Sequence, residues 1–238
     1  MIKDELKRQM QRTSQLHSTR LERSDLSDIE ALEHWQKDRI TQTYADLRSK
    51  PRYQSATDFF VNELYAPSNV VDRDADLERM YPTMIRLLPD GVLTTISKSI
   101  ELQADTLALD LKMVEALHDL GENPLEVNVD SYVRAYRHLD NEAERRHQVE
   151  LIMAVGRELD HYVHIPLVYA TLKMARLPAK MAGLLDLQEF LEEGFAAFRS
   201  MGNATDFLET IERRELSIMK EILAGNPDPF THGEPGTQ

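Results

Sequence analysis

Apolar residues recur at intervals of three and four along most of the chain, and this spacing constrains the fold more than any other feature. It is clearest in segment 92–120. Similar patterns predict further helices at about 27–49, 54–65, 72–88, 131–139, 141–175, 179–201 and 204–224. Strand-like alternation occurs only in segment 126–130, which is too short to form a sheet. We therefore predict an all-α, multi-helix bundle of about eight helices with no sheet.

Glycine and proline mark the ends of these segments. Gly121, Gly202 and Gly225 each follow a predicted helix, at the position where glycine commonly ends one. Pro166 falls inside the segment 141–175 and predicts a bend there. Neither a repeat nor a linker divides the chain. We expect an N-terminal arm or weak helix over residues 1–24, a single helical domain over 25–225, and a disordered tail over 226–238.

The charge balance bears on the partners. The chain has 28 basic and 41 acidic residues, which gives a formal net charge of −13. Such a charge repels phosphate groups, so we expect neither nucleic acid nor an anionic membrane as a partner. The sequence has no cysteine, no apolar run long enough to span a membrane, and no signal peptide at its start. We expect a cytoplasmic protein.

A short aromatic motif suggests a family. Phe59-Phe60-x-x-Glu63-Leu64-Tyr65 resembles the signature of the FFLEELY-motif proteins, an uncharacterised bacterial family. Six other segments that support the resemblance lie within residues 32–202: Trp35-Gln36, Thr43-Tyr44-Ala45-Asp46-Leu47, Pro51-Arg52-Tyr53, Arg73-Asp74-x-Asp76, Arg86-Leu87-Leu88-Pro89 and Gly194-Phe195-Ala196-Ala197-Phe198. Val61 and Asn62 stand where the family name has Leu and Glu. The resemblance implies a bacterial helical protein and brings no activity with it.

The motif can also be interpreted from its spacing. Phe60 and Leu64 lie four residues apart, as do Val61 and Tyr65, so these four side chains form a broad apolar helix face. This face would pack into the core. Phe59 lies beyond it, and Phe59 and Tyr65 could instead form part of a surface for a partner protein.

Two acidic patterns are candidates for metal binding. The acidic run from Asp72 lacks the glycine and the final glutamate of a calcium loop. The pairs Glu144/His147 and Glu158/His161 lie on one predicted helix, roughly 21 Å apart, so they cannot share an ion. Both pairs fall on the side of that helix opposite its apolar face. We expect no bound metal and no cofactor.

The segment 92–120 has two polar stripes between two apolar faces. The fully charged stripe, which includes Glu101 and Asp105, should face water. The other stripe should point inward and could line a ligand pocket together with His164: Ser99, Gln103, Thr106 and Asp110. A buried carboxylate needs a partner, so we expect Asp110 to be hydrogen-bonded to His138, His161, His164 or an arginine. Asp110 is also the one candidate for acid–base catalysis.

Three functions stay open. No motif for a nucleophilic hydrolase, a phosphate-binding loop or a dinucleotide site is present, which favours a non-enzymatic interaction or regulatory protein with a protein partner or self-association. An enzyme or a small-molecule binder with a pocket near Asp110 is the alternative, and a carrier of an apolar ligand is a third. A structural Asp110 predicts that Asp110→Asn lowers stability, whereas a functional one predicts that stability is kept or raised.

Overall fold

The computed structural model describes residues 1–64, 70–181 and 185–231. These residues form eleven α-helices and no strand, which confirms the all-α class with more helices than the eight expected. The helices are α1 (Ile2–Glu22), α2 (Leu26–Thr43), α3 (Ala45–Arg48), α4 (Gln54–Phe59), α5 (Val70–Leu87), α6 (Asp90–Asp119), α7 (Val129–Leu139), α8 (Glu142–Val163), α9 (Pro166–Met181), α10 (Leu185–Met201) and α11 (Thr205–Ala224). A π-helical turn, Phe60–Leu64, follows α4, and a 3-10 turn, Pro124–Glu126, precedes α7.

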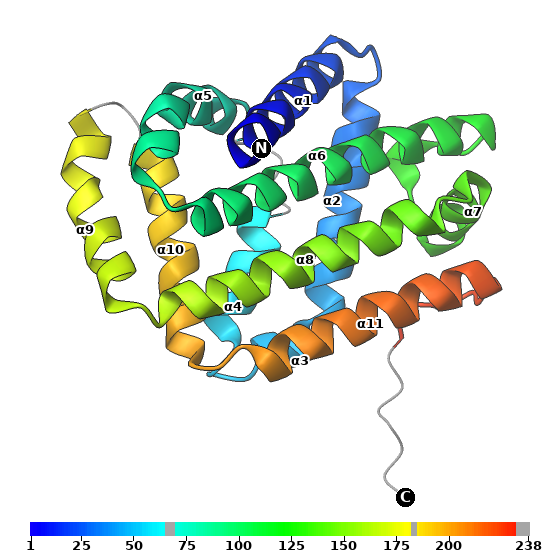
Figure 1. Ribbon diagram of the computed structural model, residues 1–238. Coiled ribbons are helices and arrows are strands. Elements are labelled where there is room, and N and C mark those ends of the chain that lie inside the picture. Colours follow the sequence, from blue (N-terminus) through cyan, green and yellow to red (C-terminus); the bar gives the residue numbers. More distant parts are fainter. Residues whose placement is uncertain (65–69, 182–184, 232–238) are drawn as a thin grey trace, which may run out of the picture.

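Four long helices form successive tiers of the bundle. Helices α1, α6, α8 and α11 follow one another from top to bottom in Figure 1, and α2 crosses behind them. Helix α7 closes one end by packing on α6 and α11, while α9 and α10 lie at the other end (Figure 1). Helix α6 contacts α1, α2, α7 and α8, and is therefore the central helix that its two apolar faces predict.

The N-terminal segment is an ordered part of the bundle. Of the two alternatives that the sequence left open, helix or arm, the structure shows a helix. Helix α1 packs along α6, with Leu6 fully buried and Met10 nearly so. Its apolar stripe is narrow because polar residues such as Thr13 also face α6, where they are satisfied by backbone carbonyls.

The C-terminal tail differs from expectation over residues 226–231. Instead of being disordered, this part lies against the bundle, where Phe230 packs beside Trp35 with ring centres 6.0 Å apart. The proline and glycine content of the tail predicts disorder, but Phe230 packs on the core and Asn226 donates a hydrogen bond of 3.0 Å to Glu221. Residues 232–238 lie outside the described part of the chain.

The two internal prolines have different effects. Helix α8 ends at Val163 and α9 begins at Pro166, so the bend expected in 141–175 is a full break. Helix α5 continues through Pro82. Helix α9 extends to Met181, which also corrects the helix predicted to start at 179.

Three apolar clusters stabilise the fold. The first lies between α2, α6, α7 and α11, and the second between α2, α4, α8, α10 and α11. The third joins α1 and α5 to the first half of α6. Within the described residues, no helix combines the length and apolar character that a membrane crossing requires.

Candidate functional site

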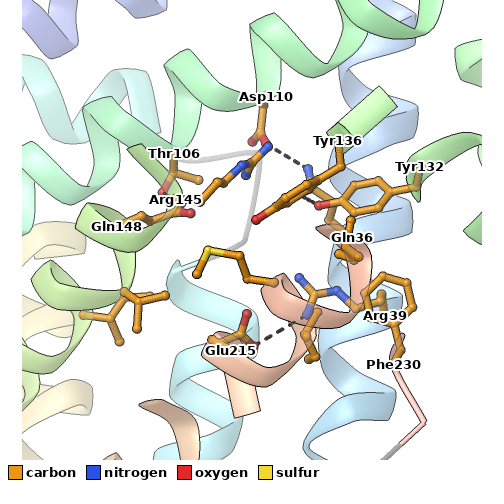
Figure 2. Close-up of a pocket in the computed structure, with 15 residues that line it drawn as sticks. Gln36, Arg39, Thr106, Asp110, Tyr132, Tyr136, Arg145, Gln148, Glu215 and Phe230 are labelled. Atoms are coloured by element: carbon orange, nitrogen blue, oxygen red, sulfur yellow. Dashed lines mark hydrogen bonds and ion pairs between the residues drawn. The ribbon is translucent and has the colours of Figure 1, made fainter. Parts of the chain in front are cut away.

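A small cavity lies where α2, α6, α7, α8 and α11 meet. It encloses about 50 Å³, room for roughly three or four water molecules or one small ligand. Polar side chains line one part of it: Gln36, Arg39, Thr106, Asp110, Tyr132, Tyr136, Arg145, Gln148 and Glu215. The remaining wall is apolar: Val149, Ile152, Ile218, Met219, Ile222 and Phe230. Figure 2 shows the polar groups converging from several helices. Ligand pockets combine apolar walls with convergent polar groups, and this small cavity has both, with the polar groups in the majority.

Asp110 lies on α6 at the cavity wall and is only 6% exposed. Its Oδ1 atom accepts a hydrogen bond of 2.9 Å from Nε2 of Gln36 on α2 (Figure 2). The hydroxyl of Tyr132 on α7 lies 3.5 Å from Oε1 of the same Gln36. Asp110 is therefore buried and hydrogen-bonded, as the sequence predicts, but its partner is an amide rather than a histidine or an arginine.

Burial is the main influence on the charge of Asp110. It raises the pKa of Asp110 to about 7, and the negative charge of Glu33 adds to this effect. The hydrogen bond from Gln36 and the positive charge of Arg145 lower the pKa, but by less. A carboxyl group of this kind can take up or release a proton near neutral pH.

Arg145 is the most unusual group at the cavity. It belongs to α8, is only 7% exposed, and lies over the ring of Tyr136 with its guanidinium carbon 4.8 Å from the ring centre. Its Nε and Nη2 atoms are buried and have no hydrogen-bond partner among the described residues. Burial in the same region raises the pKa of Tyr136 above its usual value. A buried guanidinium with unused donors is costly, so it is a candidate for ligand binding.

The second arginine of the cavity has a carboxylate beside it. Arg39 of α2 lies 3.6 Å from Glu215 of α11, and its guanidinium carbon is 5.3 Å from the ring centre of Phe230. Glu215 in turn accepts a hydrogen bond of 2.6 Å from the hydroxyl of Tyr44. The charge of Arg39 is therefore already balanced within the protein.

Two of the predicted pocket residues line the cavity and three do not. Thr106 joins Asp110 there and accepts a hydrogen bond of 2.7 Å from Gln148. Ser99 donates to the carbonyl of Thr95 on its own helix instead, and Gln103 is half-buried outside the cavity. The cavity covers about one turn of α6, so it reaches only the last part of the predicted stripe.

His164 does not line the cavity. It ends α8, roughly 28 Å along the helix from Arg145. Its side chain is 54% exposed and lies 3.6 Å from Asp160. The separation follows from the length of α8, because an uninterrupted helix runs from Arg145 to this end.

Of the two residues predicted for a partner surface, the structure describes only Phe59. Phe59 is half-buried and its ring packs over Gly194 of α10, where a Cβ atom would lie 2.6 Å from its Cζ atom. Tyr65 lies outside the described residues. Phe60 is 7% exposed and packs edge-on against Tyr44 at 5.9 Å, as expected of the core face.

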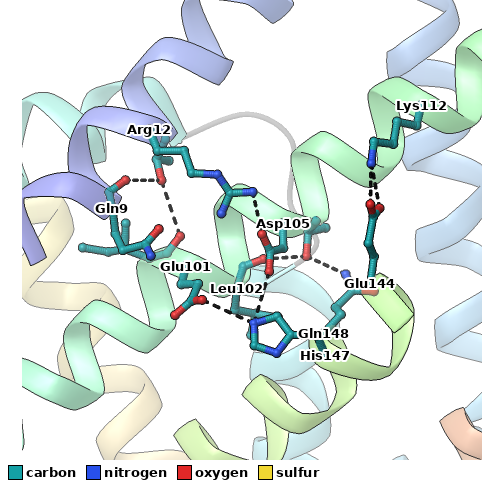
Figure 3. A network of polar contacts seen from close by, with 12 residues as sticks. Gln9, Arg12, Glu101, Leu102, Asp105, Lys112, Glu144, His147 and Gln148 are labelled. Atoms are coloured by element: carbon teal, nitrogen blue, oxygen red, sulfur yellow. Dashed lines mark hydrogen bonds and ion pairs between the residues drawn. The ribbon is translucent and has the colours of Figure 1, made fainter. Parts of the chain in front are cut away.

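A second polar cluster joins α1, α6 and α8 (Figure 3). His147 lies 3.3 Å from Glu101 and 3.8 Å from Asp105, and the guanidinium of Arg12 lies 2.7 Å from Asp105. The three ligand-type residues are close enough to hold a cation, but Arg12 already supplies one. Asp105 is only 16% exposed, which corrects the expectation that this part of the charged stripe faces water. Helix α1, which the sequence left open as a helix or an arm, covers Asp105.

Some pocket residues could have been recognised from spacing. Arg145 precedes Val149 by four residues on α8 and therefore shares the helix face that the sequence assigns to the core. Tyr132 and Tyr136 are related in the same way on α7. Nothing local in the sequence places Arg39 or Glu215 at the same cavity, because they come from helices distant in the chain.

A family model described as a domain of unknown function (DUF8198) matches residues 8–229, which is most of the chain. The protein belongs to this family. No curated protein and no solved structure is significantly similar to it. The match covers every helix that contributes to the cavity, and of the lining residues only Phe230 lies just beyond its end.

Proposed function

We propose that the protein binds a small anion, with a carboxylate or phosphate group, in the cavity beside Arg145. The observation that carries this proposal is the pair of buried donors, Nε and Nη2 of Arg145, that lack a partner among the described residues. Native proteins satisfy nearly all such groups, and a guanidinium cannot avoid the cost by losing its proton. A bound anion would remove this cost.

The positions of the two donors suggest how the anion is held. The Nε–H bond and one Nη2–H bond of a guanidinium point in parallel from one edge of the group. This edge matches the two oxygens of a carboxylate or phosphate, and it is the basis of bidentate binding. We infer that Tyr136, stacked against Arg145, fixes the plane of the guanidinium before the ligand arrives.

The surrounding charges favour an anion over a cation. The positive charge of Arg145 lowers the pKa of Asp110, but burial outweighs this and raises it to about 7, so Asp110 is partly neutral at physiological pH. Glu215 is shared by Arg39 and Tyr44. Among the described residues, Arg145 therefore has no fully charged counter-ion of its own. The apolar wall formed by Ile152, Met219 and their neighbours would accommodate a short hydrocarbon part of an organic acid.

Thermal unfolding with a panel of small anions tests this proposal. Acetate, succinate and inorganic phosphate would each be added to about 10 mM at constant ionic strength, with chloride as the reference. For a dissociation constant near 1 mM, the free energy of unfolding should rise by roughly 1.4 kcal/mol, which corresponds to an increase in Tm of about 3–6 °C. The ranking within the panel distinguishes a carboxylate from a phosphate ligand.

Two neighbouring arginines of α8 provide a matched pair of variants. Arg145→Met should abolish the increase in Tm, whereas Arg146→Met should retain it, because Arg146 is about half exposed and pairs with Glu142. An unchanged response in Arg145→Met, or no response of the wild type to any panel member, would count against the proposal.

Several expectations from the sequence stay predictions. They are the bacterial origin and the FFLEELY-motif relationship, the cytoplasmic location, and the absence of catalysis. Binding of an anion by Arg145 is compatible with a regulatory protein and with an enzyme that uses Asp110 as an acid or base, and turnover of the bound anion would distinguish the two.

A further inference from the structure

Helix α9 carries large apolar side chains on its outer side. Leu167, Met174, Leu177 and Met181 are 72%, 68%, 66% and 82% exposed, respectively. The helix lies at the edge of the molecule beyond α10 (Figure 1), and among the described helices it packs against α8 and α10. Single exposed apolar residues are common in proteins, but four on one helix need an explanation.

The spacing of these residues is regular. Together with Ala170, which is also exposed, they follow the alternating steps of three and four residues that define the contact line of a coiled coil. We call Leu167, Ala170, Met174, Leu177 and Met181 the α9 seam. The opposite side of α9 is already used, because Val168, Tyr169 and Leu172 pack on the second core cluster. A helix with apolar residues on two sides is expected to be covered on both.

The charge of α9 differs from that of the rest of the chain. Its sequence contains three basic residues and no acidic one, in a protein with a formal net charge of −13. Lys173 and Lys180 each directly precede a seam methionine, the position from which a coiled-coil helix makes salt bridges to its partner. Lys173 and Arg176 also pair with Glu192 of α10, but both remain about half exposed.

We propose that the α9 seam docks an acidic amphipathic helix of a partner protein. The seam supplies the apolar contact, and the flanking lysines select a partner with glutamate or aspartate beside its own apolar line. At about 1.5 Å per residue, the 16 residues of α9 provide roughly 24 Å of contact. The proposal does not depend on anion binding, because α9 contributes no residue to the cavity.

Charge disfavours the other ways of covering the seam. In an antiparallel pair of α9 helices from two copies, lysines would face lysines, and in a parallel pair they would still meet no acidic side chain, because α9 contains none. Neither arrangement gains a salt bridge. An anionic membrane would attract the basic side of α9 but repel the acidic remainder of the molecule.

Binding of two designed peptides tests the proposal with the full-length protein. Both would be helical three-heptad peptides with leucine at the contact positions, one with glutamate and the other with lysine at the flanking positions. In fluorescence anisotropy at 0.15 M salt, the glutamate peptide should bind at least tenfold more tightly than the lysine peptide. Leu177→Asp should weaken its binding at least tenfold, whereas Leu125→Asp should not, although Leu125 is 58% exposed and equally apolar.

Three outcomes would overturn the proposal. Equal affinity for both peptides, or no binding of either, would show that the seam does not select an acidic helix. A dimeric mass in analytical ultracentrifugation, reduced to that of a monomer by Leu177→Asp, would assign the seam to a second copy. Sedimentation of the protein with phosphatidylserine vesicles, abolished by the same variant, would assign it to a membrane. Circular dichroism of each variant confirms that the helices are retained.

Discussion

Gln36 of α2 donates a hydrogen bond of 2.9 Å to Asp110 of α6, and this bond joins two helices within the interior of the bundle. An amide cannot neutralise a carboxylate, so the charged form of Asp110 has only a neutral donor in direct contact. This is why burial dominates and the pKa of Asp110 rises to about 7.

The first prediction concerns Asp110→Asn. Because the folded-state pKa is raised above the value of 3.8 for an isolated aspartate, the folded protein binds the proton more tightly than the unfolded chain. The wild type therefore loses stability as the pH rises from about 4 to about 7, and the loss is complete above pH 7. Asparagine keeps the bond from Gln36 without the charge, so the variant should be about 2–4 kcal/mol more stable than the wild type at pH 8.

Urea unfolding of both proteins at pH 4.5 and pH 8 measures this effect. The difference in the free energy of unfolding should be small at the lower pH and large at the higher one. If Asp110→Asn is less stable than the wild type at pH 8, Asp110 is a structural residue, which is the alternative that the sequence left open.

The second prediction concerns the stability effect of Arg145→Met. Methionine is of comparable length and removes a buried charge together with two unused donors. Replacement of buried ionic groups by apolar residues of similar volume is often neutral or stabilising. Without ligand, we expect the free energy of unfolding to stay equal or to rise by about 1–2 kcal/mol. A decrease of 3 kcal/mol or more in denaturant unfolding would instead show that Arg145 is satisfied within the protein.

The third prediction compares the adjacent aromatic residues of the sequence motif. Phe60→Ala should lower the free energy of unfolding by about 3–5 kcal/mol, since Phe60 is nearly fully buried and packs against Tyr44. Phe59→Ala should cost less, because Phe59 is only half-buried. Equal losses in chemical denaturation, or a larger one at Phe59, would show that the assignment of the two faces is wrong.

The fourth prediction concerns the contact between Phe59 and Gly194. A Cβ atom at position 194 would lie 2.6 Å from Cζ of Phe59, which is too close for two non-bonded carbon atoms. Gly194→Ala should therefore destabilise the protein by about 1–3 kcal/mol. In the double variant with Phe59→Ala, the methyl group added at position 194 has space. The loss of stability caused by Gly194→Ala should therefore nearly disappear in that background. A double-mutant cycle measures this coupling, and simple additivity would argue against the contact.

The sequence predicted the fold class well because helix periodicity is a local property. It also predicted that Asp110 points inward. Helix α6 has two polar stripes between its two apolar faces, and with the charged stripe assigned to solvent the other one must face the interior. It failed at Asp105, where α1 covers a stripe expected to face water, and at His164, where the helix breaks. The error at Asp105 concerns packing between distant segments, which periodicity does not encode, whereas His164 lies too far along α8 to reach the cavity.

The candidate site was predictable only in part for the same reason. Thr106 and Asp110 belong to the stripe identified on α6, and both line the cavity. Arg39, Tyr136 and Glu215 each look ordinary within their own helices. They line one cavity only because α2, α7 and α11 pack around α6 and α8. No motif in the sequence predicts this packing.

The most direct test of the account is the location of a bound anion in a crystal of the full-length protein. Selenate mimics a tetrahedral oxyanion, and the anomalous scattering of its selenium marks its position without ambiguity. We predict one strong anomalous peak in the cavity, with two selenate oxygens within hydrogen-bond distance of Nε and Nη2 of Arg145, and no such peak in crystals of Arg145→Met. If, in the presence of selenate, Nε and Nη2 of Arg145 form hydrogen bonds only with protein atoms, the proposed function is contradicted.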